Sequence, residues 1–149
     1  MIVLHIEGVK EFMEQLFYGD MFDRFHVKDC EVATFTVFRI DGRRQDEWYD
    51  TDEREGDGTG FVTWNQLKPY VAEWIKGKKK PRKMEMNFCH YMKDGDVGFL
   101  RVHYEKEQLH LYTGYMQKEF LPDKEKQQQW DENCRNFIRK NKIVSTQIS

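Results

Sequence analysis

The sequence predicts an α+β fold in which two helices accompany a mainly antiparallel sheet and an extra helix follows at the C-terminal end. Apolar residues recur at helical spacing in three stretches, near residues 9–17, 64–75 and 122–142. Between these stretches, several segments alternate apolar and polar residues with the period of a strand. The predicted helices and strands do not alternate strictly along the chain. That order favours an antiparallel sheet over the parallel sheet of α/β proteins.

The length of 149 residues indicates one domain, with an α+β core over residues 1–118 and a C-terminal helix and tail over 119–149. Lys and Arg number 24 against 26 Asp and Glu, so nucleic-acid binding would need a local basic patch. The cysteines are three, with no Cys-x-x-Cys, which excludes a disulfide scaffold and a zinc ribbon. The apolar N-terminus lacks the basic region of a signal peptide, and no apolar run approaches the roughly 20 residues that span a bilayer. We therefore expect a soluble, cytoplasmic protein with no membrane partner and no cofactor.

The first half of the chain begins with a strand over Met1–Glu7 and a helix from Val9 to about Gly19. Residues 31–40 are dense in β-forming residues and run into Asp41-Gly42, a strong hairpin signal. A return strand is then expected over Arg43–Tyr49. Residues 50–58 form an acidic loop that we expect to be mobile. Its carboxylates do not have the spacing of an EF-hand, so the sequence predicts no metal site there.

The second half is more regular. A short strand over Gly60–Thr63 enters a helix, and Thr63 with Gln66 fits a capping box although Pro69 lies inside the helix. A half-buried strand is expected over residues 84–91. Two further strands, 98–104 and 108–115, meet at Lys106-Glu107, and a two-residue turn there pairs Tyr104 with Leu109, Val102 with Leu111 and Leu100 with Thr113. A third helix is expected over Pro122–Lys142, with Pro122 in its first turn. It is expected to dock by one edge or on a partner, and Val144–Ser149 to fray.

One dense basic run is a candidate for binding nucleic acid, because clustered cations release counterions from a phosphate backbone. Its members are Lys76, Lys78, Lys79, Lys80, Arg82 and Lys83. The alternative is a solvated loop between a helix and a strand, which the slightly acidic charge of the whole chain favours.

The predicted register sets His103 opposite His110 on the polar face of the sheet, with Arg101 next along. Two imidazoles across a strand pair can relay a proton or hold a metal ion. No third ligand is evident and Arg101 would repel a cation, so no metal site is predicted. The three residues are candidates for a catalytic site, against the alternative of an ordinary polar sheet face. No established catalytic or nucleotide-binding motif is present.

The order of elements resembles a single domain of the sliding DNA clamp fold, the fold of polymerase processivity factors. The stretches that carry the resemblance are 1–6, 9–17, 60–63, 67–75, 84–88, 99–104 and 109–115. The resemblance implies a clamp-like core over residues 1–118. The chain has room for one such domain, Glu11 and Glu14 stand on a helix that faces DNA in clamps, and the C-terminal helix has no counterpart. The whole chain also resembles a bacterial protein family of unknown function.

These observations favour a non-enzymatic binding or assembly module. Exposed sheet edges and the third helix would mediate self-association or capture a protein partner. The alternatives are a nucleic-acid-associated protein acting through the basic run, and a small enzyme acting through the face of His103 and His110.

Overall fold

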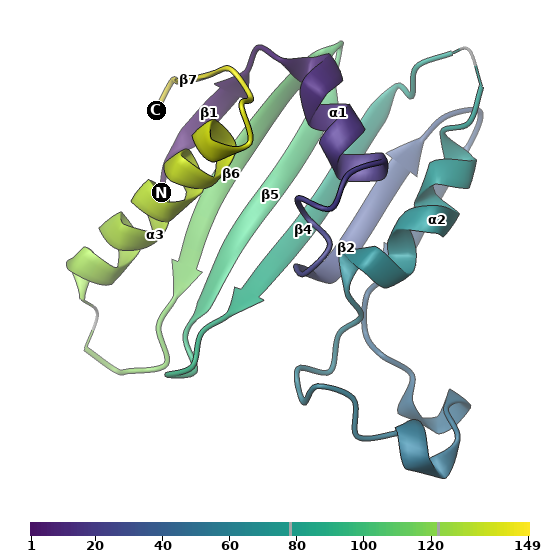
Figure 1. The fold of residues 1–149 in the computed structure, drawn as a ribbon, viewed down its shortest axis with the longest axis vertical. Helices are drawn as coiled ribbons and strands as arrows, with labels where there is room; N and C mark the ends of the chain where they lie inside the picture. Colours follow the sequence, from purple (N-terminus) through teal and green to yellow (C-terminus); the bar gives the residue numbers. More distant parts are fainter. Residues whose placement is uncertain (78, 122) are drawn as a thin grey trace.

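The computed structural model describes residues 1–77, 79–121 and 123–149, and it is built on one seven-stranded antiparallel sheet (Figure 1). The elements in chain order are β1 (Val3–Ile6), α1 (Val9–Phe17), β2 (His26–Ala33), β3 (Val37–Asp41), the 3-10 helices η1 (Asp46–Trp48) and η2 (Thr51–Glu53), α2 (Trp64–Trp74), β4 (Lys83–Tyr91), β5 (Val97–Glu105), β6 (Gln108–Met116), α3 (Lys124–Lys140) and β7 (Ser145–Gln147). The strands lie in the order β3-β2-β4-β5-β6-β1-β7. Every neighbouring pair is antiparallel, which confirms the predicted α+β class.

All three α-helices cover the same face of the sheet, and the core lies between the two layers (Figure 1). The strands contribute alternate side chains to that core, as strand geometry requires. The largest fully buried side chains are Ile6, Phe12, Leu16, Phe22, Trp64, Met84, Met86, Phe88, Leu100, Leu109, Leu111 and Ile138. The opposite face of the sheet carries the polar side chains, and none of the described helices lies over it (Figure 1); we call it the open face.

The β5–β6 hairpin has the predicted register. Tyr104 pairs with Leu109, and Leu100 pairs with Thr113. The two turn residues, Lys106 and Glu107, have φ values of 54° and 62°. Positive φ at both positions matches the hairpin turn whose twist suits the flanking strands. The local pattern was therefore sufficient to fix this part of the sheet.

The predicted turn at Asp41-Gly42 is wrong. The β2–β3 hairpin turns earlier, at residues 34–36, and Cys30 pairs with Ile40 across it. Gly42 serves a different purpose, because a Cβ there would lie 1.7 Å from the carbonyl oxygen of Val27. The glycine lets two backbones approach closely where β3 ends, and its N–H donates to the Lys28 carbonyl oxygen at 2.9 Å.

The predicted return strand over Arg43–Tyr49 is also wrong. Arg43 makes a single bridge to Phe61, and the chain then enters η1. The predicted strand over Gly60–Thr63 is reduced to that bridge and one between Thr63 and His26. Residues 44–58 project beyond the sheet (Figure 1), and Arg44 holds them together by donating to the backbone oxygen of Arg54 at 2.6 Å.

Helix α2 begins at Trp64 and carries the predicted capping box, in which the backbone N–H of Thr63 donates to Gln66 Oε1 at 3.0 Å. The buried indole of Trp64 donates to the carbonyl oxygen of Leu16 at 2.7 Å. Its ring also packs edge-on against Phe17. These contacts join α2 to α1 and fix the spacing between the two helices.

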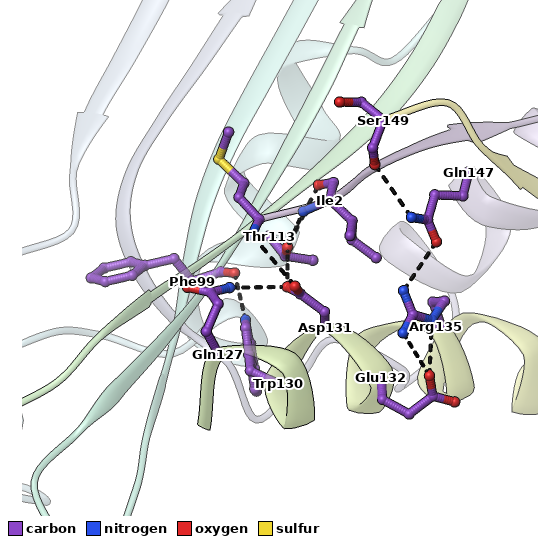
Figure 2. A network of polar contacts seen from close by, with 11 residues as sticks. Ile2, Phe99, Thr113, Gln127, Trp130, Asp131, Glu132, Arg135, Gln147 and Ser149 are labelled. Atoms are coloured by element: carbon purple, nitrogen blue, oxygen red, sulfur yellow. Dashed lines mark hydrogen bonds and ion pairs between the residues drawn. The ribbon is translucent and has the colours of Figure 1, made fainter. Parts of the chain in front are cut away.

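Helix α3 packs on its own sheet (Figure 2). Its N-cap is Asp123, whose side chain accepts from the N–H of Glu125 at 2.9 Å, and Pro122 lies outside the described residues. The predicted apolar stripe is buried, with Trp130, Cys134 and Ile138 each under 7% exposed. The indole of Trp130 lies against the backbone of β5, where a Cβ on Gly98 would come within 2.6 Å of the ring.

A polar contact anchors the same helix from inside the protein (Figure 2). The hydroxyl of Thr113 donates to Asp131 Oδ1 at 2.6 Å and accepts from the backbone N–H of Ile2 at 2.9 Å. The prediction that residues 144–149 fray is wrong, because β7 pairs with β1 and Arg135 donates to Gln147 Oε1 at 3.0 Å. Helix α3 and β7 thus complete the sheet at the β1 edge.

Candidate functional site

A row of polar side chains crosses the open face at one register position. His5 on β1, His110 on β6 and His103 on β5 are successive cross-strand neighbours. Glu85 on β4 lies opposite His103, and Glu31 on β2 lies opposite Glu85. Directly opposed residues on one face have Cβ atoms about 4.5–5.5 Å apart, so each side chain in the row can contact the next.

The two histidines singled out from the sequence have the predicted register but different partners. His110 Nε2 lies 3.2 Å from Nδ1 of His5. His103 instead lies between two carboxylates, with Nδ1 3.2 Å from Glu85 Oε1 and Nε2 3.3 Å from Glu105 Oε2. The row is therefore divided into an imidazole pair and an imidazole–carboxylate cluster.

Arg101, the third candidate, belongs to the cluster around Glu85. Its Nε lies 3.2 Å from Glu85 Oε1, and its guanidinium lies 4.6 Å from the centre of the Tyr112 ring. The described structure places no carboxylate in hydrogen-bonding contact with both His103 and His110. A catalytic role for these three residues remains a prediction.

Sequence reasoning missed His5, which lies 105 residues from His110. Local spacing carries no information on which distant strand lies beside β6. The pairing of β1 with β6 brings the third imidazole into the row. Burial lowers the pKa of His110, and the neighbouring positive charges of His5 and then His103 lower it further. Both effects disfavour the positively charged form of the His110 ring.

The helical face carries an apolar groove of about 560 Å³ between α1 and the segment that joins α2 to β4. Its floor is formed by Met84 and Tyr104, and its walls include Met13, Phe17 and Ile75. The rim is acidic, with four carboxylates and two ammonium groups, from Glu7, Glu11, Glu14, Glu107, Lys10 and Lys80. We call this feature the α1–α2 groove.

The predicted basic run follows the C-terminal end of α2, and Lys78 lies outside the described residues. Three of its cations lie near carboxylates: Lys80 is 3.3 Å from Glu107, Lys76 is 3.7 Å from Glu73 and Lys83 is 4.0 Å from Glu31. The N–H of Arg82 donates to the Ala33 carbonyl at 2.8 Å, so the run lies beside the β2–β3 turn.

That turn presents aromatic surface next to the basic run. Phe35 at its tip is 92% exposed. Phe38 on β3 stacks on Trp74 of α2, with ring centres 4.7 Å apart and planes 12° apart. The basic run thus borders an aromatic patch formed by Phe35, Phe38 and Trp74.

The described residues contain one group of three side chains whose oxygens converge as metal ligands could. It consists of Asp50, Asp52 and Glu53, which are exposed and have ligand atoms within 4.8 Å of one another. They belong to the segment in which the sequence predicted no metal site. Exposed carboxylates commonly gather in this way without an ion, so the group does not by itself define a site.

The cysteines are unsuited to nucleophilic chemistry. All three are buried and unpaired. Burial raises the pKa of Cys30 to about 12, of Cys89 to about 11 and of Cys134 to about 12. The reactive form is the thiolate, and these thiols stay protonated at neutral pH. They act as small apolar side chains of the core.

The fold and its sites define a small α+β protein with one covered and one open sheet face. Within the described ranges, no helix has both the length and the apolar character needed to cross a bilayer. Residues 15–145 match the family of unknown function DUF5721, and the chain belongs to that family. No curated protein and no solved structure matches the chain.

Proposed function

We propose that this protein is a non-enzymatic binding module that holds an apolar, basic peptide segment of a partner protein in the α1–α2 groove. The observation that carries the proposal is an apolar groove of about 560 Å³ with an acidic rim. Ligand sites are concave and mostly apolar, with a few polar groups that set orientation.

The chemistry of the groove favours a peptide with apolar anchors. Met13 and Met84 are unbranched and adapt their shape to different apolar side chains. Tyr104 is 4% exposed and lies in the floor, where its ring offers a flat contact surface. An amphipathic segment that lays alternate apolar side chains in a groove is a common mode of peptide recognition.

The charges at the rim favour a basic segment. Glu11 and Glu14 project from α1 and are exposed, and no ion pair is described for either. Lys80 and Glu107 neutralise each other at one end of the groove. The other charged groups of the lining are three carboxylates and one ammonium group, an excess of negative charge that would orient a cationic peptide in the groove.

The arrangement of the chain supports the clamp-like fold as the scaffold of this module. The chain contains the order extended segment, helix, strand, strand twice. The first unit is β1–α1–β2–β3, and the second consists of residues 61–63, α2, β4 and β5. The strands β2 and β4 pair antiparallel at the junction, and both helices lie on one face (Figure 1). Glu11 and Glu14 would repel a DNA backbone, so the proposal includes no encircled DNA.

The third helix and the β1 edge are occupied within the chain itself, since α3 packs on the sheet and β7 pairs with β1. The outer edges of β3 and β7 remain unpaired in the described structure, and the α1–α2 groove is an apolar hollow on the covered face. The proposal therefore assigns partner capture to the groove.

The test uses a fluorescently labelled helical peptide of alternating Leu and Lys faces, with a Leu/Glu peptide of equal length as its control. We expect saturable binding of the Leu/Lys peptide and at least tenfold weaker binding of the Leu/Glu peptide. The double variant Glu11→Lys/Glu14→Lys should weaken binding of the Leu/Lys peptide about tenfold, since two exposed charge contacts of about 0.7 kcal/mol each amount to one factor of ten.

A matched control is Glu47→Lys/Glu55→Lys, which changes the net charge equally on the projecting segment away from the groove. Its binding should equal that of the unmodified protein. Met13→Asp should abolish binding of the Leu/Lys peptide, because it places a carboxylate in the apolar wall of the groove. The protein should stay folded, because Met13 is only half buried. Equal binding by both peptides, or equal loss in both double variants, would refute the proposal.

A second candidate function is association with single-stranded nucleic acid at the basic run and the aromatic patch. The observation in its favour is the exposed Phe35 on the turn that follows Ala33, whose carbonyl accepts from the N–H of Arg82, because bases stack on aromatic side chains while cations contact the backbone. Binding of an oligonucleotide should weaken steeply with salt and be lost in Lys79→Glu/Lys80→Glu/Arg82→Glu. No binding at low salt would exclude this role. The α1–α2 groove variants Glu11→Lys/Glu14→Lys separate it from the first proposal, since they should not weaken it.

A further inference from the structure

The five histidines of the chain occupy different environments. His26 contacts Asp57, His90 stacks on Trp130 with ring centres 5.9 Å apart, and His103 lies between two carboxylates. His5 and His110 contact each other. Neither has a carboxylate partner in the described parts of the chain.

The spacing of this pair matches that of two ligands on one metal ion. Imidazole nitrogens bind Zn(II) at about 2.0–2.1 Å, which places two ligand nitrogens of one ion roughly 3 Å apart. The observed distance between His5 Nδ1 and His110 Nε2 is 3.2 Å. The ring centres are 5.0 Å apart and the planes are inclined by 51°. The contact is a hydrogen bond when one of the two facing nitrogens carries a proton, and a bound ion would take the place of that proton.

The surroundings allow an ion to enter. Both side chains are half buried on the open face of the sheet, opposite the face that the three α-helices cover. Water can therefore reach the site and fill its remaining coordination positions. A metal ligand must be unprotonated, so binding should release any proton held between the two imidazoles and should weaken as the pH falls.

We propose that His5 and His110 form a chelating site for a divalent transition metal ion of the class that prefers imidazole nitrogen, such as Cu(II) or Zn(II). The ion would link β1 to β6 on the open face, on the side of the sheet away from the α1–α2 groove. The site does not depend on the proposed peptide binding.

The neighbouring groups define the limits of the site. His103 is held by Glu85 and Glu105, so it does not supply a third ligand. The guanidinium of Arg101 lies over the ring of Tyr112 on β6, and its pairing with the carboxylate of Glu85 offsets its positive charge. Two protein ligands and water give a site of modest affinity. Nitrogen-preferring ions should fill it in the order of the divalent series, with Cu(II) bound more tightly than Zn(II).

The experiment titrates the full chain, free of any purification tag, with Cu(II) and with Zn(II) at pH 7.5. Isothermal titration calorimetry measures the affinity and the number of ions bound. For Cu(II), electron paramagnetic resonance reports directly on nitrogen ligands. We expect one ion per chain and a spectrum with two imidazole nitrogens. His5→Gln and His110→Gln should each weaken binding at least tenfold, whereas His103→Gln should leave the affinity and the spectrum unchanged.

A second control separates this site from the exposed acidic group. Asp52→Asn removes one of its three carboxylates, and hard cations prefer such oxygen ligands. The proposal would be overturned if the unmodified protein bound no ion. It would also be overturned if His5→Gln and His110→Gln still bound the ion with full affinity, or if Asp52→Asn lost it. The melting temperature of each variant without metal shows whether it is folded.

Discussion

The Thr113→Val substitution tests whether the buried polar contact beneath α3 holds the helix and β1 on the sheet (Figure 2). The hydroxyl donates to Asp131 at 2.6 Å and accepts from the N–H of Ile2 at 2.9 Å. Thr113 is 1% exposed, so water cannot replace it. Valine has nearly the same shape, and the substitution removes both hydrogen bonds while keeping the packing.

The expected cost follows from the two bonds. A hydrogen bond to a charged group contributes about 1.5–3 kcal/mol, and a buried donor left without a partner costs about 1–3 kcal/mol. Gln127 still donates to Asp131 at 3.0 Å, and the new methyl group recovers about 0.8 kcal/mol. We therefore expect the free energy of unfolding to fall by about 2–4 kcal/mol.

Urea denaturation measures this change, and a lower midpoint with an unchanged slope shows a loss of stability without a change in the surface exposed on unfolding. The control is Thr34→Val, because the buried hydroxyl oxygen of Thr34 has no hydrogen-bond partner in the described structure. That substitution should be neutral or stabilising. If Thr113→Val costs under about 0.5 kcal/mol, or if both variants lose the same stability, the polar anchor is not what holds α3.

Three further predictions concern the backbone and the pH dependence. Gly42→Ala should lower the midpoint of urea denaturation strongly, because its Cβ would lie 1.7 Å from the Val27 oxygen; an unchanged midpoint would show that β3 ends differently. Replacing Lys106-Glu107 by Asn-Gly should raise the free energy of unfolding by about 1 kcal/mol, since both residues have positive φ, and a decrease in melting temperature would contradict this reasoning. The hydrogen bond from His26 lowers the pKa of Asp57 to about 2, below the ordinary value of about 3.9, so its stabilising effect is complete above about pH 4 and is lost as the pH falls through about 2. The melting temperature should therefore fall more steeply between pH 4 and 2 in the unmodified protein than in Asp57→Asn. If the melting temperatures of the two proteins fall equally with pH, the contact between Asp57 and His26 does not stabilise the fold.

The features that the sequence predicted well depend on neighbours along the chain. The β5–β6 register follows from alternation and a two-residue turn, and the start of α2 follows from the Thr63–Gln66 capping box. The hairpin turn predicted at Asp41-Gly42 was wrong because of a contact between segments that are distant in the sequence. The missing side chain of Gly42 makes room for the carbonyl of Val27, a requirement that no local pattern reveals.

The candidate sites show the same division. The opposed positions of His103 and His110 could be predicted, because one hairpin carries both. The contact of His110 with His5 could not be predicted, because it depends on the pairing of two strands that are far apart in the sequence. The α1–α2 groove likewise joins residues from both halves of the chain, and only the packing of α1 on the sheet brings Met13 beside Met84 of β4.

The position of β1 between β6 and β7, near one edge of the sheet, has a consequence for how the protein folds. The strands β4, β5 and β6 pair with their neighbours through short connections. Strand β1 instead pairs with residues that come more than 100 positions later in the chain, as in the pairing of Val3 with Tyr112. Contacts of such long sequence separation slow folding, because the chain must be closed into a large loop before they form. During synthesis the first strand therefore leaves the ribosome long before its place in the sheet exists, and its docking with α3 and β7 is expected to be the last step of folding.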